Sequence, residues 1–458
     1  MIKTKNLPGF YKTLFLIAIP IILQQLMQTF VNMLDTIMVG QLGSVEIAAV
    51  GLGNQIFFIL NMILFGIASG GSIFIAQYWG KKDIQRIRQT LGVMLSISVI
   101  ISLIFACGAI CIPETLIGFY SKDTAVIQCG AQYLKAIGLS YPIMAVGFAY
   151  QFAFRSTEHV RLPMICTLIS FSVNAALNML LIFGLTVQFG PFSVSVPAFG
   201  VAGAAIATLI SRTIETGILL LYSYSKKYEP CGSLKEILSF DKSFAARFAR
   251  IAFPVICNET LWGTGITIEN AIFARAGTDA IAAFNITGTI SQLTWAAVIG
   301  CGNAAGIIIG KHIGAGKEKE AFSYAGRFAW FIPFLGFCVS ALLYPLSLLL
   351  PFLFKVEPDI LRQAQYMMWV LICFYPFNAF NMTFIVGICR SGGDTKYAAF
   401  HDLFWMWSIS IPLGFAAALV FHWQPWQVYI CLLIENIFKA SAGILRLHSG
   451  KWMHNVTV

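Results

Sequence analysis

Residues 14–43 read LFLIAIPIILQQLMQTFVNMLDTIMVGQLG, and residues 248–277 read FARIAFPVICNETLWGTGITIENAIFARAG. The two stretches align without a gap at a separation of 234 residues, as the positions of Pro20 and Pro254 show. The alignment is carried by prolines, acids and glycines: Pro20 with Pro254, Asp35 with Glu269, Gly43 with Gly277, Gly66 with Gly300, and Gly80 with Gly314. Because aliphatic residues match between any two membrane helices, these special positions are the evidence for an internal duplication.

The composition places the chain in a membrane. It is 58% hydrophobic and 11% charged, whereas soluble domains carry about 25% charged residues. Apolar runs of at least the roughly 20 residues that a helix needs to cross a bilayer recur along the chain. They lie at 14–39, 50–78, 88–112, 130–154, 162–185, 198–224, 248–274, 283–309, 324–352, 361–388, 398–421 and 425–447. We predict an all-α polytopic membrane protein with twelve transmembrane helices in two pseudo-symmetric sets of six.

The N-terminal run and the cysteines do not indicate a secreted protein. The first run is too long for a signal-peptide core and is followed by no small-residue cleavage site, so we expect it to be retained. The chain has 11 cysteines, but most lie within predicted spans. We therefore expect packing thiols rather than disulfides, as at Cys107, Cys166, Cys338 and Cys373.

The basic residues sort by side of the membrane rather than forming a stripe for nucleic acid. Cytoplasmic loops collect Lys and Arg. With the N-terminus inside, the outer side keeps few of the 30 basic residues, namely Lys122, Lys135, Arg275, Lys355 and Arg362. The inner loops receive nearly all the others, Arg390 and Lys439 among them. We predict a multi-pass protein of the cell membrane with both termini cytoplasmic.

Six crossings in each half return the chain to its starting side, so the halves are parallel repeats related by an axis along the membrane normal. The longest charged stretch, Lys226 to Arg250, contains Pro230 and Gly232 and joins the halves. We predict an N-terminal bundle at 1–225, a cytoplasmic linker at 226–247 and a C-terminal bundle at 248–458. The repeat extends to Tyr141-Pro142 with Tyr375-Pro376, and to Arg155-Ser156 with Arg390-Ser391.

Polar side chains inside the spans are the candidate functional residues, because a charge at the bilayer centre costs several kcal/mol. Gln24, Gln28 and Asp35 lie on one face of the first span at helical spacing. The seventh span carries a second polar set: Asn258, Glu259, Thr260, Thr264 and Glu269. Both sets should face protein or water.

Two interpretations of the acids are open. Removal from water disfavours the charged form of a carboxylate, so Asp35, Glu259 and Glu269 could exchange a proton or Na⁺ for substrate. Alternatively, the acids complete hydrogen-bond networks between packed helices, and Glu269 forms an interfacial ion pair with Arg275. Glu215 and Glu435 are expected to pair locally, with Arg212 three residues before and Lys439 four residues after.

Side-chain amides and small residues complete the pattern. Asn174 and Asn178 lie four apart on the fifth span, where paired amides either coordinate a cation through oxygen or join helices. Gly302, Gly306, Gly310 and Gly314 form a ladder that favours close helix packing. Pro20 and Pro254 permit a kink early in the first span of each half.

The combination of motifs resembles the multidrug and toxic compound extrusion (MATE) family, with mixed features of its NorM and DinF branches. The motifs are Pro20 with Asp35-Thr-Ile-Met-Val-Gly-Gln-Leu-Gly, Asn174 with Leu177-Asn178 and Leu181-Ile-Phe-Gly, and Arg390-Ser-Gly-Gly-Asp394-Thr. The resemblance covers essentially the whole chain. It implies two six-helix bundles around a central cavity and export of cationic, often aromatic, compounds by Na⁺ or H⁺ antiport.

The resemblance also implies roles for particular residues. Asp35 matches the family's first-helix coupling aspartate, Asn174 its fifth-helix asparagine, and Asn178 a position where some members have a second aspartate. Glu259 and Tyr375 are similar to a glutamate and a tyrosine of the NorM branch. The tenth-helix aspartate expected four residues after Tyr375 falls on Ala379, which puts a standard C-terminal Na⁺ site in doubt.

These arguments give two sets of candidate residues. The cation-coupling set is Asp35, Asn174, Asn178, Glu259 and Tyr375, with possible Na⁺ at Asp35, Asn174 and Asn178 or at Glu259 and Tyr375. The substrate and cavity set is Gln24, Gln28, Glu269, Asn378, Asn381, Trp262 and Trp295, in which the aromatic rings suit cation–π contacts.

The expected function is secondary active efflux of organic cations, drugs or metabolites, across the plasma membrane by a monomer in contact with lipid. The alternative is a flippase for lipid or lipid-linked oligosaccharide, which would line its lumen with Arg and Lys, whereas the embedded charges are mainly Asp and Glu. An ATP-driven pump or a metalloprotease would need a P-loop or a His-Glu-x-x-His motif, and the sequence has neither. We expect no enzyme activity, no nucleic-acid partner and no cofactor besides the coupling ion.

Overall fold

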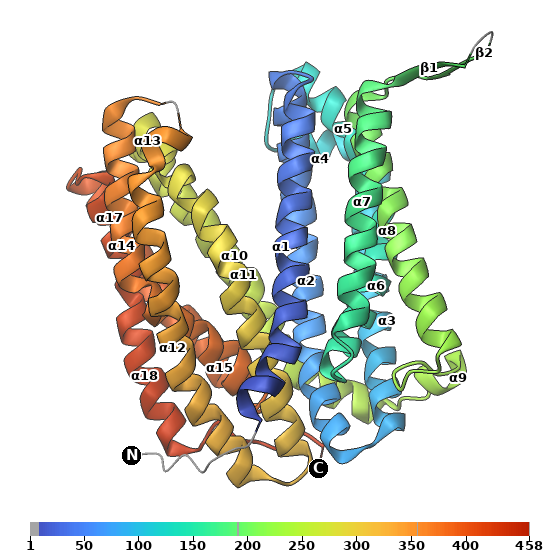
Figure 1. The fold of residues 1–458 in the computed structure, drawn as a ribbon, viewed down its shortest axis with the longest axis vertical. Helices are drawn as coiled ribbons and strands as arrows, with labels where there is room; N and C mark the ends of the chain where they lie inside the picture. Colours follow the sequence, from blue (N-terminus) through green and yellow to red (C-terminus); the bar gives the residue numbers. More distant parts are fainter. Residues whose placement is uncertain (1–8, 190–191, 355, 458) are drawn as a thin grey trace. The chain divides into compact units, whose positions relative to one another are not determined.

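Helices make up nearly all of the computed structural model, which describes residues 9–189, 192–354 and 356–457 (Figure 1). The first half contains α1 (Phe10–Gly40), α2 (Ser44–Lys81), α3 (Ile84–Cys111), α4 (Pro113–Gly118), α5 (Thr124–Gly138), α6 (Ser140–Ser156), α7 (Arg161–Phe183), β1 (Leu185–Phe189), β2 (Phe192–Val196), α8 (Gly200–Ser225) and α9 (Leu234–Ile237). The second half contains α10 (Lys242–Ala276), α11 (Thr278–Gly314), α12 (Glu318–Leu348), α13 (Leu350–Leu353), α14 (Pro358–Met382), η1 (Thr383–Arg390), α15 (Thr395–Trp405), η2 (Met406–Ser410), α16 (Ile411–Phe415), η3 (Ala416–Val420), α17 (Pro425–Leu433) and α18 (Glu435–Ser449), where η denotes a π-helix.

The predicted fold class is confirmed. Among the described residues, ten helical runs are long and apolar enough to cross a membrane, and α5 with α6, bent by 47° against each other, makes an eleventh. The remaining predicted span lies in α10, which at 35 residues is also long enough to cross. Its apolar character is diluted by Asn258, Glu259 and Glu269. Each of the twelve predicted spans overlaps one of these helical runs, with ends that differ by a few residues, as at 162–185, where α7 ends at Phe183.

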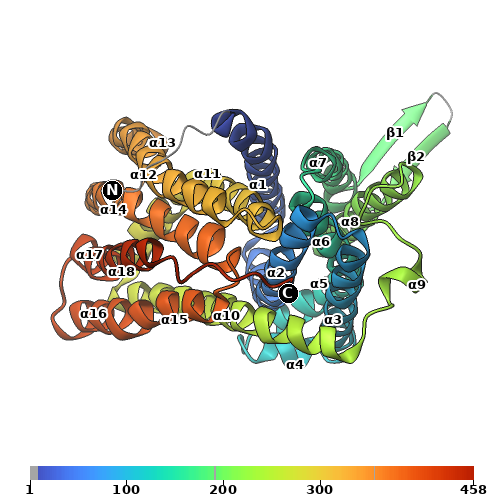
Figure 2. The same ribbon diagram turned by 90° about the horizontal axis from the view of Figure 1, so that it is seen from below.

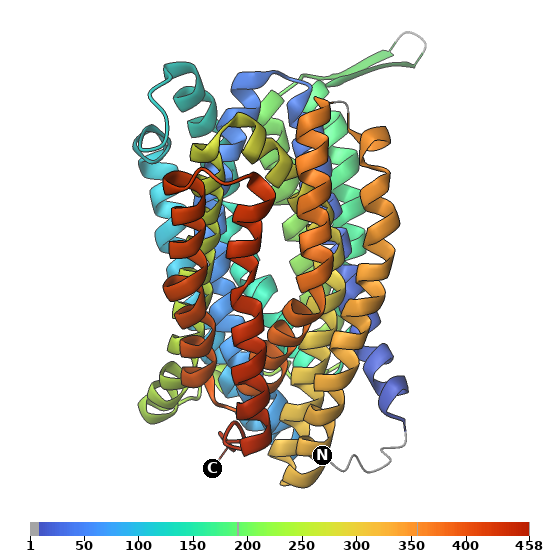
Figure 3. The same ribbon diagram turned by 90° about the vertical axis from the view of Figure 1, so that its left-hand side faces the viewer.

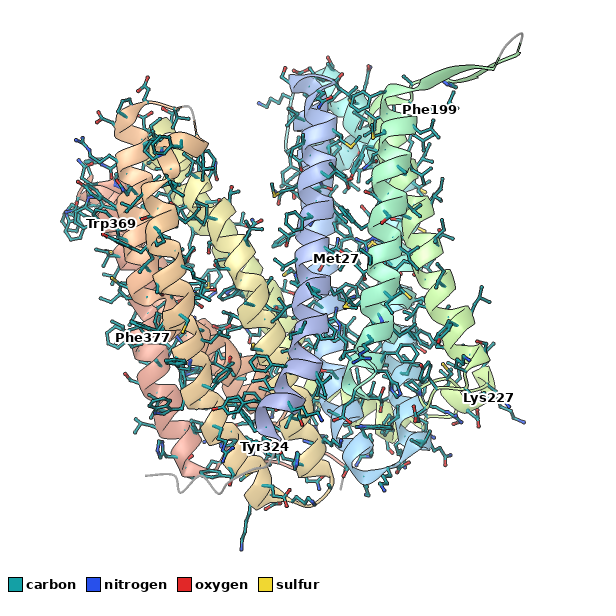
Figure 4. All side chains as sticks on the ribbon, in the orientation of Figure 1. Met27, Phe199, Lys227, Tyr324, Trp369 and Phe377 are labelled. Carbon is teal, nitrogen blue, oxygen red and sulfur yellow. The ribbon has the colours of Figure 1, made fainter. Side chains whose placement is uncertain are left out.

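A β-hairpin between α7 and α8 was not predicted. β1 and β2 pair antiparallel, with Leu185 opposite Val196 and Phe189 opposite Phe192. Apolar and polar residues alternate along both strands, which is the period of a strand rather than a helix. Phe199, where the chain enters α8, lies at the hairpin end of that helix, and Lys227 lies just beyond the opposite end (Figure 4). The hairpin is an extension of a membrane-helix loop.

The chain forms two compact units that do not follow the linear halves. The C-terminal unit comprises Met1–Ile22, Ser72–Asp83 and Ala249–Val458, and the N-terminal unit comprises Leu23–Gly71 and Ile84–Phe248. Helices α1 and α2 therefore each contribute to both units. In the N-terminal unit α7 packs along α8, and α3 packs against α6. In the C-terminal unit α11, α12 and α14 pack together (Figure 2), and the final two crossings run antiparallel on either side of residues 421–424 (Figure 3).

Close backbone contact explains why the end of α2 belongs to the C-terminal unit. A Cβ added at Gly314 would overlap the carbonyl oxygen of Gln77, and one added at Gly80 would overlap that of Lys311. The Gln77 amide also donates to Ser391 O at 2.9 Å and accepts from Val456 N at 2.8 Å. The C-terminal end of the predicted glycine ladder thus joins α2 to α11.

Two other glycines of the ladder pack against a different segment from Gly314. Gly302 and Gly306 lie against the backbone of η1, with ordinary contact distances of 3.8 and 3.6 Å for an added Cβ.

All 11 cysteines are free thiols. Of the four predicted to pack inside, Cys166 is buried, whereas Cys107, Cys338 and Cys373 are exposed on the outside of the helices, as a small apolar residue facing lipid can be.

Replacing Gly314 by Ala should destabilise the protein by about 1–3 kcal/mol, because the new methyl group overlaps a backbone carbonyl that cannot rotate away. The measurement is thermal unfolding of the purified protein in detergent. Gly288→Ala in the same helix is the control, since nothing lies within 4 Å of its added Cβ. Equal melting temperatures for the two variants would contradict the close α2–α11 contact.

Candidate functional site

Asp35 lies in a cluster with the two predicted asparagines. The Asn178 amide donates to Asp35 Oδ1, and the same Nδ2 atom donates to Asn174 Oδ1 at 3.1 Å. Asn174 and Asn178 are one helical turn apart on α7, so both reach the same side of α1. Both are buried, and Asn178 Oδ1 has no hydrogen-bond partner in the part of the chain that the structure describes. The Asp35 cluster (Asp35, Asn174, Asn178) therefore combines one carboxylate with amide oxygens, one of which is unused.

Gln24 belongs to a separate network in the same unit. Its Nε2 donates to Gln151 Oε1 and to Thr167 Oγ1, both at 2.9 Å, and its Oε1 accepts from Arg155 Nε at 3.2 Å. Thr167 in turn donates to Glu215 Oε1 at 2.7 Å. The predicted local pair is confirmed, since Arg212 contacts Glu215 Oε2 at 2.9 Å. Gln24 thus ties α1 to α6 and α7, while Gln28, one turn further along α1, is half-buried.

A chain of charged and amide groups runs through the C-terminal unit. Arg390 Nη1 contacts Glu259 Oε1 at 2.6 Å, and Arg390 Nη2 donates to Asn258 Oδ1 at 3.1 Å. The Asn258 amide donates to Asp402 Oδ2 at 2.8 Å. Lys439 Nζ then contacts both Asp402 Oδ1, at 2.8 Å, and Glu435 Oε1, at 2.9 Å. We call these six residues of α10, η1, α15 and α18 the C-terminal network.

The two networks are related by the internal repeat. Gln24 corresponds to Asn258, Arg155 to Arg390 and Thr167 to Asp402, at separations of 234 or 235 residues. In each unit an arginine donates to the oxygen of a first-helix amide, whose nitrogen donates to the third partner. The duplication therefore includes a hydrogen-bond pattern, to which the C-terminal unit has added the charges of Glu259 and Asp402.

Two members of the C-terminal network, Arg390 and Asp402, are not among the charge pairs expected from the sequence. Arg390 and Lys439 are expected in inner loops, but both are buried inside the unit. Arg390 is the last residue of the π-helix η1. A buried acid such as Glu259 requires a basic partner, and the repeated Arg155-Ser156 and Arg390-Ser391 pairs were the available signal. Only Glu435 and Lys439 were expected to pair, and that local pair is confirmed.

The other predicted residues lie in different surroundings. The Tyr375 hydroxyl donates to Thr294 O at 2.8 Å, so Tyr375 and Glu259 bond to separate partners. Asn381 donates to Asn436 O at 2.9 Å. Trp262, Trp295 and Asn378 are half-buried, and Ala379 is buried, in the described chain.

Glu269 does not form the interfacial ion pair considered from sequence. Within the described residues it makes no ion pair with Arg275, and its Oε1 atom lies 3.4 Å from the hydroxyl of Ser410 in η2. It is also close enough to Glu435 and Lys439 for their charges to act on it. Glu269 therefore faces the C-terminal network rather than the end of its helix.

Comparisons with known proteins agree with the architecture. The sequence model of the MatE family matches residues 20–180 and again residues 254–416, so the second match begins 234 residues after the first. The chain is 25% identical to the probable multidrug resistance protein NorM of Thermotoga maritima, over 98% of this chain and 94% of that protein. It is 24% identical to the probable multidrug resistance protein YoeA of Bacillus subtilis, over 90% of this chain and 88% of that protein. The crystal structure of a Vibrio cholerae MATE transporter has the same fold, with a TM-score of 0.87 at 17% identity, covering 98% of this chain and 99% of that one.

Removing one partner of the buried Arg390–Glu259 ion pair should lower the free energy of unfolding much more than removing one partner of an exposed ion pair. Arg390→Met leaves the Glu259 charge uncompensated and should cost about 3–5 kcal/mol of stability. Arg362→Met, which breaks the exposed pair with Asp359 at 2.9 Å, should cost less than about 1 kcal/mol. Unfolding in detergent measures both. The double variant Arg390→Met with Glu259→Gln should recover part of the lost stability. If Arg390→Met lowers the stability no more than Arg362→Met does, the buried pair is refuted.

Proposed function

This chain belongs to the MatE family of multidrug efflux transporters, and from that premise we propose that it exports organic cations across the plasma membrane in exchange for H⁺ or Na⁺. Members of the family are multi-pass membrane transporters and not enzymes. The relatives named above are probable multidrug resistance proteins, which supports drug-like substrates. We further propose that the protein acts as a monomer.

The Asp35 cluster is the observation that supports cation exchange best. A single carboxylate in a transmembrane helix attracts one positive charge, and the surrounding oxygens are hard ligands that suit H⁺ or Na⁺. Asn178 holds the carboxylate by a direct hydrogen bond, while its own unused oxygen is available to a metal cation. A small cation on Asp35 cancels the charge that an organic cation would otherwise use, so the two compete for one site.

The sign of the buried charges favours a cation over the anionic head group of a flippase substrate. The buried charged residues are mainly acidic, although Arg390 and Lys439 are buried as well. Each of them is neutralised by a carboxylate at 2.6–2.9 Å. Because carboxylates neutralise both Arg390 and Lys439, neither supplies an excess positive charge that would bind a pyrophosphate. This neutralisation supports a cationic substrate.

We also propose that both termini are cytoplasmic. The start of α1 and the end of α18 lie at the same end of the C-terminal unit (Figure 1), which suits an even number of crossings. The loops assigned to that end carry most of the basic residues, as the cytoplasmic side of a membrane protein does.

Asp35→Asn should slow gradient-driven transport. In proteoliposomes loaded with ethidium, the wild type should export the dye when a H⁺ or Na⁺ gradient is imposed separately, and the active gradient identifies the coupling ion. Loss of the charge removes an interaction of about 1.5–3 kcal/mol, which corresponds to at least about tenfold slower coupled efflux.

Asp279→Asn is the matched control, because Asp279 is exposed in the first turn of α11, and its efflux should equal that of the wild type. Unchanged coupled efflux by Asp35→Asn would show that the exchange site is elsewhere. Absence of efflux under either gradient, for ethidium and other organic cations, would count against the antiporter itself.

A further inference from the structure

More acids than bases meet in the C-terminal unit. Glu259 pairs with Arg390, and Asp402 pairs with Lys439. Glu435 shares Lys439 with Asp402, and Glu269 lies in the same region with no ion pair of its own among the described residues. Burying an uncompensated carboxylate is strongly unfavourable, so this region requires additional positive charge.

Lys439 cannot supply that charge in full, because it is shared. Its Nζ atom lies 2.8 Å from Asp402 Oδ1 and 2.9 Å from Glu435 Oε1, so one ammonium serves two carboxylates. Glu435 is only 8% exposed, and its second oxygen, Oε2, is buried with no hydrogen-bond partner among the described residues. A proton on that oxygen removes the buried negative charge that Lys439 compensates only in part.

The contact between Glu269 and Ser410 also indicates that a proton binds in this region. The Ser410 hydroxyl has one proton and two acceptors in reach, Leu432 O at 2.8 Å and Glu269 Oε1 at 3.4 Å. When the closer carbonyl takes that proton, the longer contact becomes a hydrogen bond only if Glu269 is protonated and donates. Glu269 is half-buried, whereas Glu435 is buried, so Glu269 lies on the more accessible side of the pair.

We propose that Glu435 and Glu269 form a proton-binding site, separate from the Asp35 cluster, in which Lys439 moves its bonding between Asp402 and Glu435 as the proton binds and leaves. With the proton on Glu435, Lys439 pairs with Asp402 alone. When the proton leaves to water by way of Glu269, both carboxylates share the ammonium. Na⁺ fits less well, because it would lie beside the Lys439 ammonium and be repelled by it.

The groups facing this site determine how it responds to pH. They are His401 and Asp402 on α15, Tyr429 on α17, Arg390 on η1, and Glu259 on α10, beside Lys439 on α18 itself. A bonded path leads away from the site, from Lys439 through Asp402 and Asn258 to Arg390 and Glu259. Proton binding at Glu435 therefore changes the bonding of Asp402 to α10 and can alter how α10, α15 and α18 are held together.

Infrared spectroscopy of the purified protein tests the site without any transport measurement. In the Asp35→Asn background, which removes the first site, the protein should show a protonated-carboxyl stretching band that shifts in D₂O and disappears as the pH rises. Adding Glu435→Gln should remove this band. Glu215→Gln is the matched control, since both oxygens of Glu215 already have partners, Thr167 at 2.7 Å and Arg212 at 2.9 Å, and it should leave the band unchanged.

Glu269→Gln provides a second variant in case Glu435→Gln cannot be purified. Removing that neighbouring negative charge should move the pH at which the band disappears downward by about one pH unit or more. The proposal is overturned if Glu435→Gln leaves the band and its midpoint unchanged, or if Glu269→Gln does not move the midpoint. Loss of the band on adding Na⁺ at constant pH would also overturn it, by showing that the site takes Na⁺.

Discussion

The cost of holding a charge inside a membrane protein without a partner is the constraint on which the rest of this structure depends. Four helical segments of the C-terminal unit meet because Glu259, Arg390, Asp402 and Lys439 each need an opposite charge within about 3 Å. The same constraint in the N-terminal unit places Glu215 between Arg212 and Thr167. Where the compensation is incomplete, at Asp35 and at Glu435, we propose that the protein binds and releases a cation.

The duplication explains the framework and leaves the chemistry to differ between the units. An arginine and a first-helix amide meet in both units, at Arg155 with Gln24 and at Arg390 with Asn258. The next residue is Gln25 in one half and Glu259 in the other, and the asparagines of the Asp35 cluster have Ile409 and Leu413 at the repeated positions. The proposed exchange site of the N-terminal unit and the charge network of the C-terminal unit can therefore both derive from one ancestral bundle.

The sequence predicted the features that depend on local spacing and composition. The spans followed from apolar length, and the Glu215–Arg212 and Glu435–Lys439 pairs followed from separations of three and four residues. Asn178 and Asp35 are 143 residues apart, and their meeting was implied by family resemblance rather than by spacing. Arg390 and Lys439 do not lie in loops as expected from their charge, and only the folded structure shows that Arg390 pairs with Glu259 and that Lys439 also pairs with Asp402. The hairpin was missed because apolar strands next to membrane helices resemble the ends of spans.

We propose that the half-buried Asp35 carboxylate releases a small cation when an organic cation binds. Adding tetraphenylphosphonium to the purified protein in weakly buffered detergent, while recording pH and bound radioactive Na⁺, measures this exchange directly. Binding of tetraphenylphosphonium should release protons or displace Na⁺, and Asp35→Asn should reduce the amount released. Binding of the organic cation with neither ion released, at any pH across the range where the protein is folded, would contradict this proposal.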